Sequence, residues 1–198
     1  MQRIEADSLA EALRLAAALH AGMTRKGTDV PYLSHLLGVA SLVVEHGGDT
    51  DCAVAALLHD AVEDCEGFDL TAVRERFGER VARIVADCTD TLPGDRPGAK
   101  SPWLERKSRY LRHLASAPAD SLLVAACDKR HNLASMVADL RREGRSTLRR
   151  FRSTPEQQLW YYEEVVRAIG KRVPDGLAAE LADLVAELST HIERRAPD

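Results

Sequence analysis

Residues 53–64, AVAALLHDAVED, place a histidine and an aspartate, His59 and Asp60, directly behind six consecutive apolar residues. A helix with this sequence is apolar nearly all round, so we expect the imidazole and the carboxylate to lie near the protein interior. Burying a carboxylate without a partner costs several kcal/mol or more. The stretch therefore predicts a buried helix with a compensating positive group at its end, and a metal ion is the obvious candidate.

The chain is long enough to bury one sizeable core. It has 198 residues, of which 45% are hydrophobic, and we expect a single domain over residues 1–198. Within it we expect a core over about 5–140 and a C-terminal helical extension over about 146–194. The N-terminus has no apolar signal-peptide core, and no stretch approaches ~18 uninterrupted apolar residues. The sequence thus predicts no membrane partner.

Charge and cysteine content narrow the class of protein further. A formal net charge of −4 argues against a protein that coats nucleic acid, for which a strongly basic face is expected. The cysteines are scattered without a CxxC pair, as is typical of reduced core residues in a cytosolic protein. We therefore expect a cytoplasmic protein without a nucleic-acid partner, while the sequence leaves the oligomeric state open.

The periodic segments predict an all-α fold. Ala, Leu, Glu and Arg dominate them, and no alternating β-branched run of strand length occurs. The first helix is predicted to start at a capping box formed by Ser8 and Glu11. A segment rich in proline and glycine, residues 92–102, predicts an irregular loop. Further helices are expected at roughly 35–46, 50–65, 69–76, 79–90, 102–117, 120–141, 155–171 and 175–194.

Two more side chains with metal-binding chemistry, one histidine and one aspartate, also adjoin apolar helical runs. His35 opens the apolar helix HLLGVASLVV, and Asp128 directly follows the apolar run SLLVAAC. Taken singly, His35 is typical of a satisfied cap or core histidine, and Asp128 of a buried ion pair with a basic neighbour. The four side chains together are a mixed nitrogen and oxygen set suited to a catalytic divalent ion with open water positions.

Two carboxylates follow in the same segment. Glu63 lies four residues after His59, and the same offset separates Asp64 from Asp60, which places them on two adjoining helical faces. The alternative interpretation is that Glu63 and Asp64 are simply solvent-exposed acidic residues at the end of a helix. Because the last turn of a helix disfavours negative charge, their placement opposes local stability, and we favour a role in catalysis.

The order of these residues resembles the ligand pattern of the HD superfamily of metal-dependent phosphohydrolases. A wider match, over roughly residues 10–140, resembles the hydrolase domain of RelA/SpoT homologues. The matching segments are ALHAGMTRKGTDVPYLSHLLGVA, AALLHDAVEDC, FGERVARIVADCTD, LERKSRYLRHL and ACDKRHNLASM. The resemblance implies an HD-domain helical bundle of roughly ten helices. It also implies removal of the 3′-pyrophosphate from ppGpp and pppGpp, typically with Mn²⁺, by a small stand-alone hydrolase without the family's synthetase domain.

The resemblance also implies roles for individual residues. The implied metal ligands are His35, His59, Asp60 and Asp128, and the implied pair that activates and orients the attacking water is Glu63 and Asp64. The implied contacts to the nucleotide substrate are Arg25, Lys26, Asn132 and Ser135. His20 matches a family position too, but a histidine on an apolar helical stripe is typical of the core, and we leave it out of the site.

Other functions share the same metal chemistry. One is an HD-type hydrolase of another phosphorylated nucleotide, such as NADPH or an adenine alarmone, and a second is a non-catalytic nucleotide-sensing HD module. The complete set of ligands and acidic residues argues against the sensor. Other divalent transition metals also suit a set of two histidines and two aspartates. The role of the C-terminal helices and of the six arginines between residues 141 and 152 stays open.

Overall fold

The structure is a computed structural model that describes residues 4–90 and 101–193. These residues form nine α-helices and two 3₁₀ helices, with one isolated β-bridge between Thr24 and Pro31. The elements are α1 (Ala6–Leu19), α2 (Leu33–Glu45), α3 (Thr50–Leu58), α4 (Ala61–Asp64), α5 (Leu70–Cys88), α6 (Trp103–Leu114), α7 (Ala119–Glu143), η1 (Arg145–Arg150), α8 (Pro155–Ile169), η2 (Gly170–Arg172) and α9 (Asp175–Glu193). The predicted all-α fold is confirmed, while the loop predicted at residues 92–102 lies almost wholly outside the described residues.

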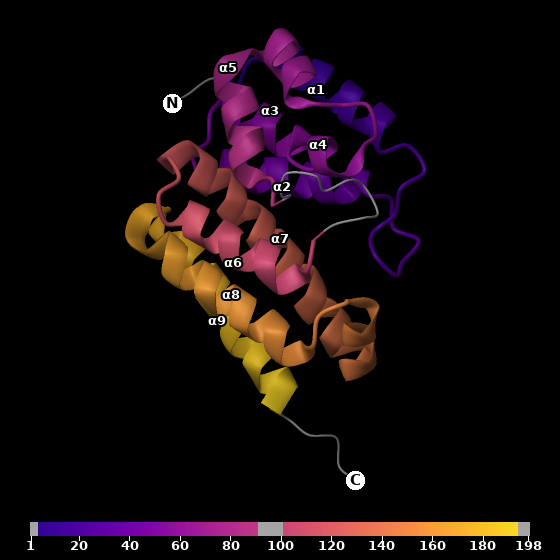
Figure 1. Ribbon diagram of the computed structural model, residues 1–198, viewed down its shortest axis with the longest axis vertical. Coiled ribbons are helices and arrows are strands. Elements are labelled where there is room, and N and C mark those ends of the chain that lie inside the picture. Colours follow the sequence, from indigo (N-terminus) through magenta and orange to yellow (C-terminus); the bar gives the residue numbers. More distant parts are fainter. Residues whose placement is uncertain (1–3, 91–100, 194–198) are drawn as a thin grey trace.

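The helices form two groups that meet at α7. Helices α1 to α5 make the N-terminal group, and α6 to α9 run side by side in the C-terminal group (Figure 1). Helix α7 packs against α2, α3 and α5 on one side and against α8 and α9 on the other. One side of α7 therefore contacts N-terminal helices that are far from it in sequence, whereas residues on its other side, such as Arg130, contact α9.

Helix α3 is the centre of the N-terminal group. All of its residues from Cys52 to Leu58 are buried, and it packs against α1, α2, α5 and α7. A helix covered on every side needs no polar face, which is why its sequence is apolar nearly all round. The side chain of Asp49 caps it by accepting a hydrogen bond of 3.1 Å from the backbone N–H of Cys52.

The continuous helix predicted over residues 50–65 is wrong. Helix α3 ends at Leu58, α4 begins at Ala61, and His59 and Asp60 form the turn between them. The ψ angle of Asp60 is −8°, well away from the helical value. Neighbouring residues on a regular helix point about 100° apart. In this turn the two side chains approach one point, with 3.0 Å between Nε2 of His59 and Oδ2 of Asp60.

The structure corrects the predicted start of the first helix and shows the predicted break between residues 76 and 79. The capping box predicted at Ser8 is wrong, because α1 begins at Ala6 and the backbone N–H of Glu5 donates to Oγ1 of Thr50 (3.0 Å). The two helices predicted at 69–76 and 79–90 appear as α5, which is interrupted at Gly78 (φ 88°, ψ 170°). Glycine adopts this conformation without the steric penalty that a side chain would bring.

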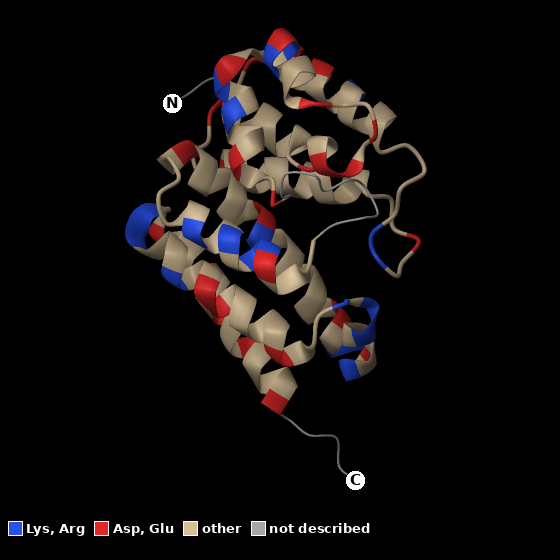
Figure 2. Cartoon of the chain, viewed as in Figure 1, with Lys and Arg blue, Asp and Glu red and all other residues tan. Residues whose placement is uncertain are grey.

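The C-terminal helices cover α7, and the arginine-rich segment follows it. Lys and Arg residues gather on η1 and on the loop between α1 and α2 that faces it (Figure 2). Several of these arginines are ion-paired: Arg141 with Glu187 of α9, and Arg150 with Asp139 and Glu143 of α7. None of the described helices has the length and apolar character needed to cross a membrane.

Candidate metal centre and adjoining cleft

Three segments bring four side chains to one point. His35 lies in the first turn of α2, His59 and Asp60 form the turn after α3, and Asp128 lies in the middle of α7. The Nε2 atom of His59 is 3.0 Å from Oδ2 of Asp60 and 3.6 Å from Oδ1 of Asp128. The Nε2 atom of His35 is 3.5 Å and 3.2 Å from the same two oxygens. The ligand atoms of His35, His59 and Asp128 all lie within 4.8 Å of one another.

The two imidazoles are oriented as metal ligands would be. Both rings are buried, and their Nε2 atoms have no hydrogen-bond partner among the described residues. The Nδ1 atom of His59 instead lies 2.7 Å from the carbonyl oxygen of Ala56, so Nδ1 carries a hydrogen and Nε2 is the nitrogen available to a metal ion. Buried polar atoms without partners are rare in proteins. Two of them facing a pair of carboxylates fit a divalent metal ion.

The carboxylates are ionised in spite of their burial. Burial by itself raises the pKa of Asp128, but Lys129 and the two histidines hold that pKa well below its usual range. Burial likewise acts to raise the pKa of Asp60, and the histidines hold it well below the usual value. Carboxylates and imidazoles ligate metals in their deprotonated forms. The ion pair that the sequence suggested for Asp128 therefore exists, and the same carboxylate also faces the histidines.

Neighbouring side chains hold both carboxylates in place. Oδ1 of Asp128 accepts a hydrogen bond of 2.5 Å from Nδ2 of Asn132, and Oδ2 accepts one from the buried ammonium group of Lys129. Oδ2 of Asp60 accepts a hydrogen bond of 2.6 Å from the hydroxyl group of Tyr32. Sequence reasoning missed Tyr32, although it lies three residues before His35, whereas Lys129 is one of the basic neighbours that it offered as an ion-pair partner of Asp128.

His20 lies behind this layer. It is buried, its ring stacks on that of Tyr32 with 5.1 Å between centroids, and burial lowers its pKa. It is therefore a packing residue that supports Tyr32.

The acidic pair Glu63 and Asp64 lies on α4, within one turn of Asp60. Oε2 of Glu63 accepts a hydrogen bond of 3.2 Å from the backbone N–H of Asp90, at the end of α5. The carboxylate of Asp90 pairs in turn with Arg106 and Lys107 of α6. Burial acts to raise the pKa of Asp90, but the two cations, Lys107 foremost, hold it below its usual value. A fixed, ionised support thus lies behind Glu63.

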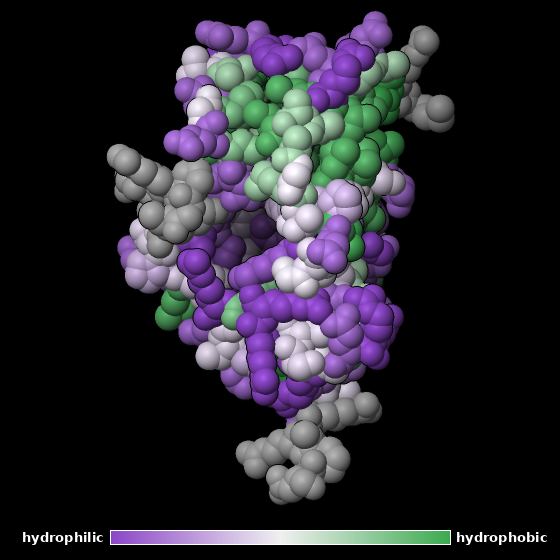
Figure 3. All heavy atoms as spheres, turned by 90° about the vertical axis from the view of Figure 1, so that its right-hand side faces the viewer, coloured by the Kyte–Doolittle hydropathy of each residue, from purple (hydrophilic) through white to green (hydrophobic). Residues whose placement is uncertain are grey.

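A cleft of about 530 Å³ opens beside the four ligands. Figure 3 shows a recess at mid-height of the molecule, bordered largely by hydrophilic side chains. All four predicted nucleotide contacts line the cleft: Arg25, Lys26, Asn132 and Ser135. Lys107, Tyr161 and Tyr162 also line the cleft, together with aromatic and basic residues that sequence reasoning did not assign to it, namely Tyr32, Trp103, Lys129 and Phe151.

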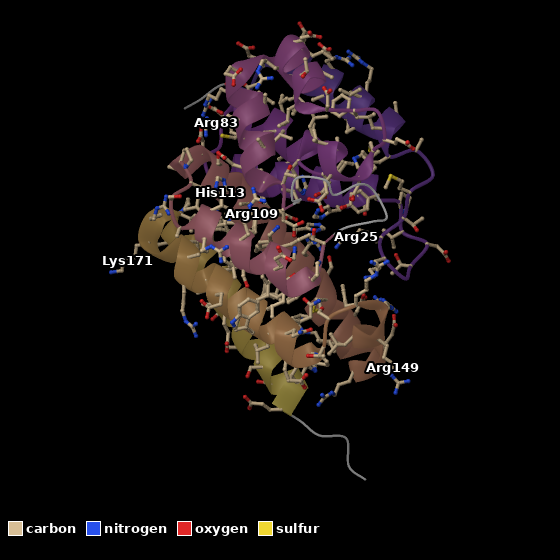
Figure 4. The ribbon with its side chains drawn as sticks, in the orientation of Figure 1. Arg25, Arg83, Arg109, His113, Arg149 and Lys171 are labelled. Atoms are coloured by element: carbon tan, nitrogen blue, oxygen red, sulfur yellow. The ribbon has the colours of Figure 1, made fainter. Side chains whose placement is uncertain are left out.

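The four predicted contacts are held in different ways. Nη2 of Arg25 donates a hydrogen bond of 2.9 Å to Oδ1 of Asn132, which links the loop after α1 to α7. The ammonium group of Lys26 lies 5.4 Å from the centre of the Phe151 ring. The hydroxyl group of Ser135 donates to the backbone carbonyl of His131 (3.0 Å). Arg25 is labelled in Figure 4, as is Arg149, an exposed residue on η1 that does not line the cleft.

This arrangement suits hydrolysis of a phosphorylated ligand. Two imidazole nitrogens and two ionised carboxylates are a ligand set for a transition metal. Glu63 follows Asp60 within one turn and has a carboxylate that can accept a proton. Cations in the cleft favour an anionic ligand, and aromatic rings favour a planar base.

Comparisons with known proteins agree with this geometry. A family model described as HD domain matches residues 12–153. The mouse guanosine-3′,5′-bis(diphosphate) 3′-pyrophosphohydrolase MESH1 is 38% identical over 134 residues, which cover 65% of this chain and 69% of the mouse protein. An Aquifex aeolicus enzyme with the same activity in its name is 40% identical over 84 residues, 42% of this chain and 12% of that protein. A solved structure of a metazoan orthologue of SpoT that hydrolyses ppGpp superposes with a TM-score of 0.76 and 25% identity, over 93% of this chain and 97% of that chain.

Proposed function

This chain belongs to the HD-domain family and, within it, to the small stand-alone hydrolases of the RelA/SpoT homologue group, and on that premise we propose that it is a metal-dependent 3′-pyrophosphohydrolase of guanosine alarmones. The reaction is the hydrolysis of ppGpp or pppGpp to GDP or GTP and pyrophosphate. One observation carries the proposal. Two buried imidazole nitrogens without partners face two ionised carboxylates beside a cleft lined by cations and aromatic rings.

The proposed ligands of the metal ion are His35, His59, Asp60 and Asp128. When bound, a divalent ion supplies Lewis acidity, which makes water more acidic and polarises a phosphoryl oxygen. We propose Mn²⁺ as the metal on the basis of the resemblance to the hydrolase domain of RelA/SpoT homologues; Fe²⁺, Co²⁺ and Zn²⁺ fit the same ligand set.

Glu63 and Asp64 are the proposed catalytic residues. Glu63 accepts a proton from the attacking water, and Asp64 orients that water. The water oxygen bonds to the phosphorus atom attached to the 3′-oxygen, the bond between that phosphorus and the 3′-oxygen breaks, and the 3′-oxygen takes up a proton to become the nucleoside hydroxyl. Because the backbone N–H of Asp90 holds Oε2 of Glu63, the base does not have to be ordered when the substrate binds.

Arg25, Lys26, Asn132 and Ser135 are the proposed contacts to the nucleotide. The hydrogen bonds from Arg25 to Asn132 and from Asn132 to Asp128 connect two of these contacts to a proposed metal ligand. Binding of the nucleoside and positioning of the metal therefore depend on the same short chain of hydrogen bonds.

A nucleotide panel tests the proposal. The full chain is stripped with EDTA, reloaded with Mn²⁺ and incubated separately with ppGpp, pppGpp, an adenine alarmone and NADPH. Pyrophosphate and orthophosphate are quantified separately. We expect pyrophosphate without orthophosphate from ppGpp and pppGpp, and no product from an Asp60→Ala variant.

The outcomes separate the competing functions. If ppGpp survives while another nucleotide is hydrolysed, the substrate assignment is wrong and the metal chemistry stands. If nucleotides bind and none is hydrolysed with any divalent ion, the protein is a sensor and the proposed reaction is wrong.

A further inference from the structure

One imidazole beside the metal centre has no part in the proposed reaction. His131 lies on α7, three residues after Asp128, and its Nδ1 atom is 3.0 Å from the Nδ1 atom of His35. The two ring centroids are 4.9 Å apart, and the ring planes are tilted by 59°. The contact is therefore a hydrogen bond between two ring nitrogens in tilted rings.

This hydrogen bond fixes which nitrogens carry hydrogen. Two facing imidazole nitrogens bond only when one carries the hydrogen and the other a lone pair. The Nε2 atom of His35 faces Asp60 and Asp128 and has no hydrogen-bond partner, as a metal ligand requires. His35 then carries its hydrogen on Nδ1. His131 must accept that hydrogen bond with a lone pair on its own Nδ1.

The backbone of α2 makes room for the accepting ring. A Cβ atom added at Gly38 would lie 2.2 Å from Nε2 and 2.5 Å from Cδ2 of His131, closer than real Cβ atoms come to their neighbours. Gly38 lies three residues after His35, on the same face of α2. Because α2 packs against α7, the ring of His131 lies where any other residue at position 38 would place its side chain.

The other histidine ligand has no such dependence on a side chain. The Nδ1 atom of His59 is bonded to the backbone carbonyl of Ala56, an acceptor that no substitution removes. The orientation of His35, by contrast, depends on the side chain at position 131. Partners of this kind typically change metal affinity by about 10–100-fold when they are removed.

We propose that His131 is a positioning residue for the metal centre. Its Nδ1 atom accepts a hydrogen bond from Nδ1–H of His35 and so keeps the Nε2 lone pair of His35 directed at the metal. Gly38 provides the space that the ring of His131 needs. This inference rests on the metal site of the proposed function, but not on the identity of the nucleotide.

Metal titrations of matched variants test the inference without any nucleotide. Leu and Asn have nearly the same shape, and only Asn carries an oxygen at the position of the histidine Nδ1. We expect His131→Leu to weaken Mn²⁺ binding, measured by calorimetry on EDTA-stripped protein, by about 10–100-fold, and His131→Asn to restore it close to the wild-type value. Gly38→Ala should weaken Mn²⁺ binding similarly, yet add nothing in a His131→Ala background. Far-UV circular dichroism checks the fold of each variant.

A second readout separates metal positioning from nucleotide contact, because His131 also lines the cleft. At saturating Mn²⁺, the KM of His131→Leu for ppGpp should change by a much smaller factor than its Kd for Mn²⁺ does. A His131→Leu protein that binds Mn²⁺ as tightly as the wild type would overturn the inference, and so would a raised KM with unchanged Mn²⁺ affinity. A wild-type protein that binds neither Mn²⁺ nor Co²⁺ would overturn both the metal site and this inference, whereas Mn²⁺ binding without ppGpp hydrolysis would overturn only the proposed substrate.

Discussion

Replacing Asp128 with asparagine should separate its role as an ion-pair partner from its role as a metal ligand. The side chains of Asp128 and Lys129 are only 6% and 11% exposed, so the variant leaves a buried ammonium group facing an amide. Removing one partner of a buried pair costs about 3–5 kcal/mol. The substitution also relieves repulsion between Asp128 and Asp60, which acts in the opposite direction. We therefore expect the free energy of unfolding to fall by an amount near the lower limit, about 3 kcal/mol. For a chain of this size this corresponds to a decrease of roughly 6–12 °C in Tm.

Thermal and urea unfolding in EDTA at pH 7 measure this loss without any contribution from metal. The double variant Asp128→Asn/Lys129→Met removes both charges and should recover most of the stability, while Mn²⁺ binding stays absent. Asp139→Asn on the same helix is the matched control, because it breaks only pairs with the more exposed Arg142 and Arg150 and should cost less than about 1 kcal/mol. An Asp128→Asn protein as stable as the wild type, or a double variant no more stable than the single one, would refute the reasoning.

Three further predictions concern catalysis, metal and pH. Glu63→Ala should lower kcat on ppGpp by about 10²–10⁴-fold at saturating Mn²⁺ while Mn²⁺ affinity is retained. As a control, replacement of the exposed Glu66 by alanine should leave kcat unchanged. Full activity in Glu63→Ala would show that Glu63 is not the base. EDTA should abolish pyrophosphate release and added Mn²⁺ should restore it, so activity that persists in EDTA contradicts a metal mechanism. Because the pKa of Asp90 is depressed in the folded state, its stabilising effect is complete above its unfolded pKa near 3.8 and is lost as pH falls through the folded value. Acid titrations of unfolding free energy should thus show a shallower decline below pH ~4 for Asp90→Asn than for wild type, whereas exposed Asp175→Asn should follow the wild type.

Sequence reasoning found the helices and the main chemical groups because both depend on short-range signals. The apolar run before His59 predicts a buried helix, and a carboxylate directly behind it predicts a compensating cation. The structure brings His35 and Asp128 to the same point as this pair, which periodicity alone does not show. The sequence suggested the set of four because each side chain adjoins an apolar helical run, and the resemblance to a known family implied the same set.

What the sequence could not predict depends on contacts between distant segments. The break at His59 and Asp60 has no glycine or proline to signal it, and the start of α1 is set by a hydrogen bond to Thr50. Tyr32 becomes part of the site through its hydroxyl contact with Asp60. The importance of Gly38 is visible only when α7 is packed against α2, since its backbone has no conformation that requires glycine.

The position of the metal centre at the junction of the two helix groups has a consequence for folding. Its proposed ligands come from α2, from the turn after α3 and from α7, so a bound ion acts as a cross-link between segments that are far apart in the chain. An ion that binds only the folded state adds about 2.7 kcal/mol to stability at 100 times its Kd. Removal of the ion would then lower the stability of the folded protein as well as its activity.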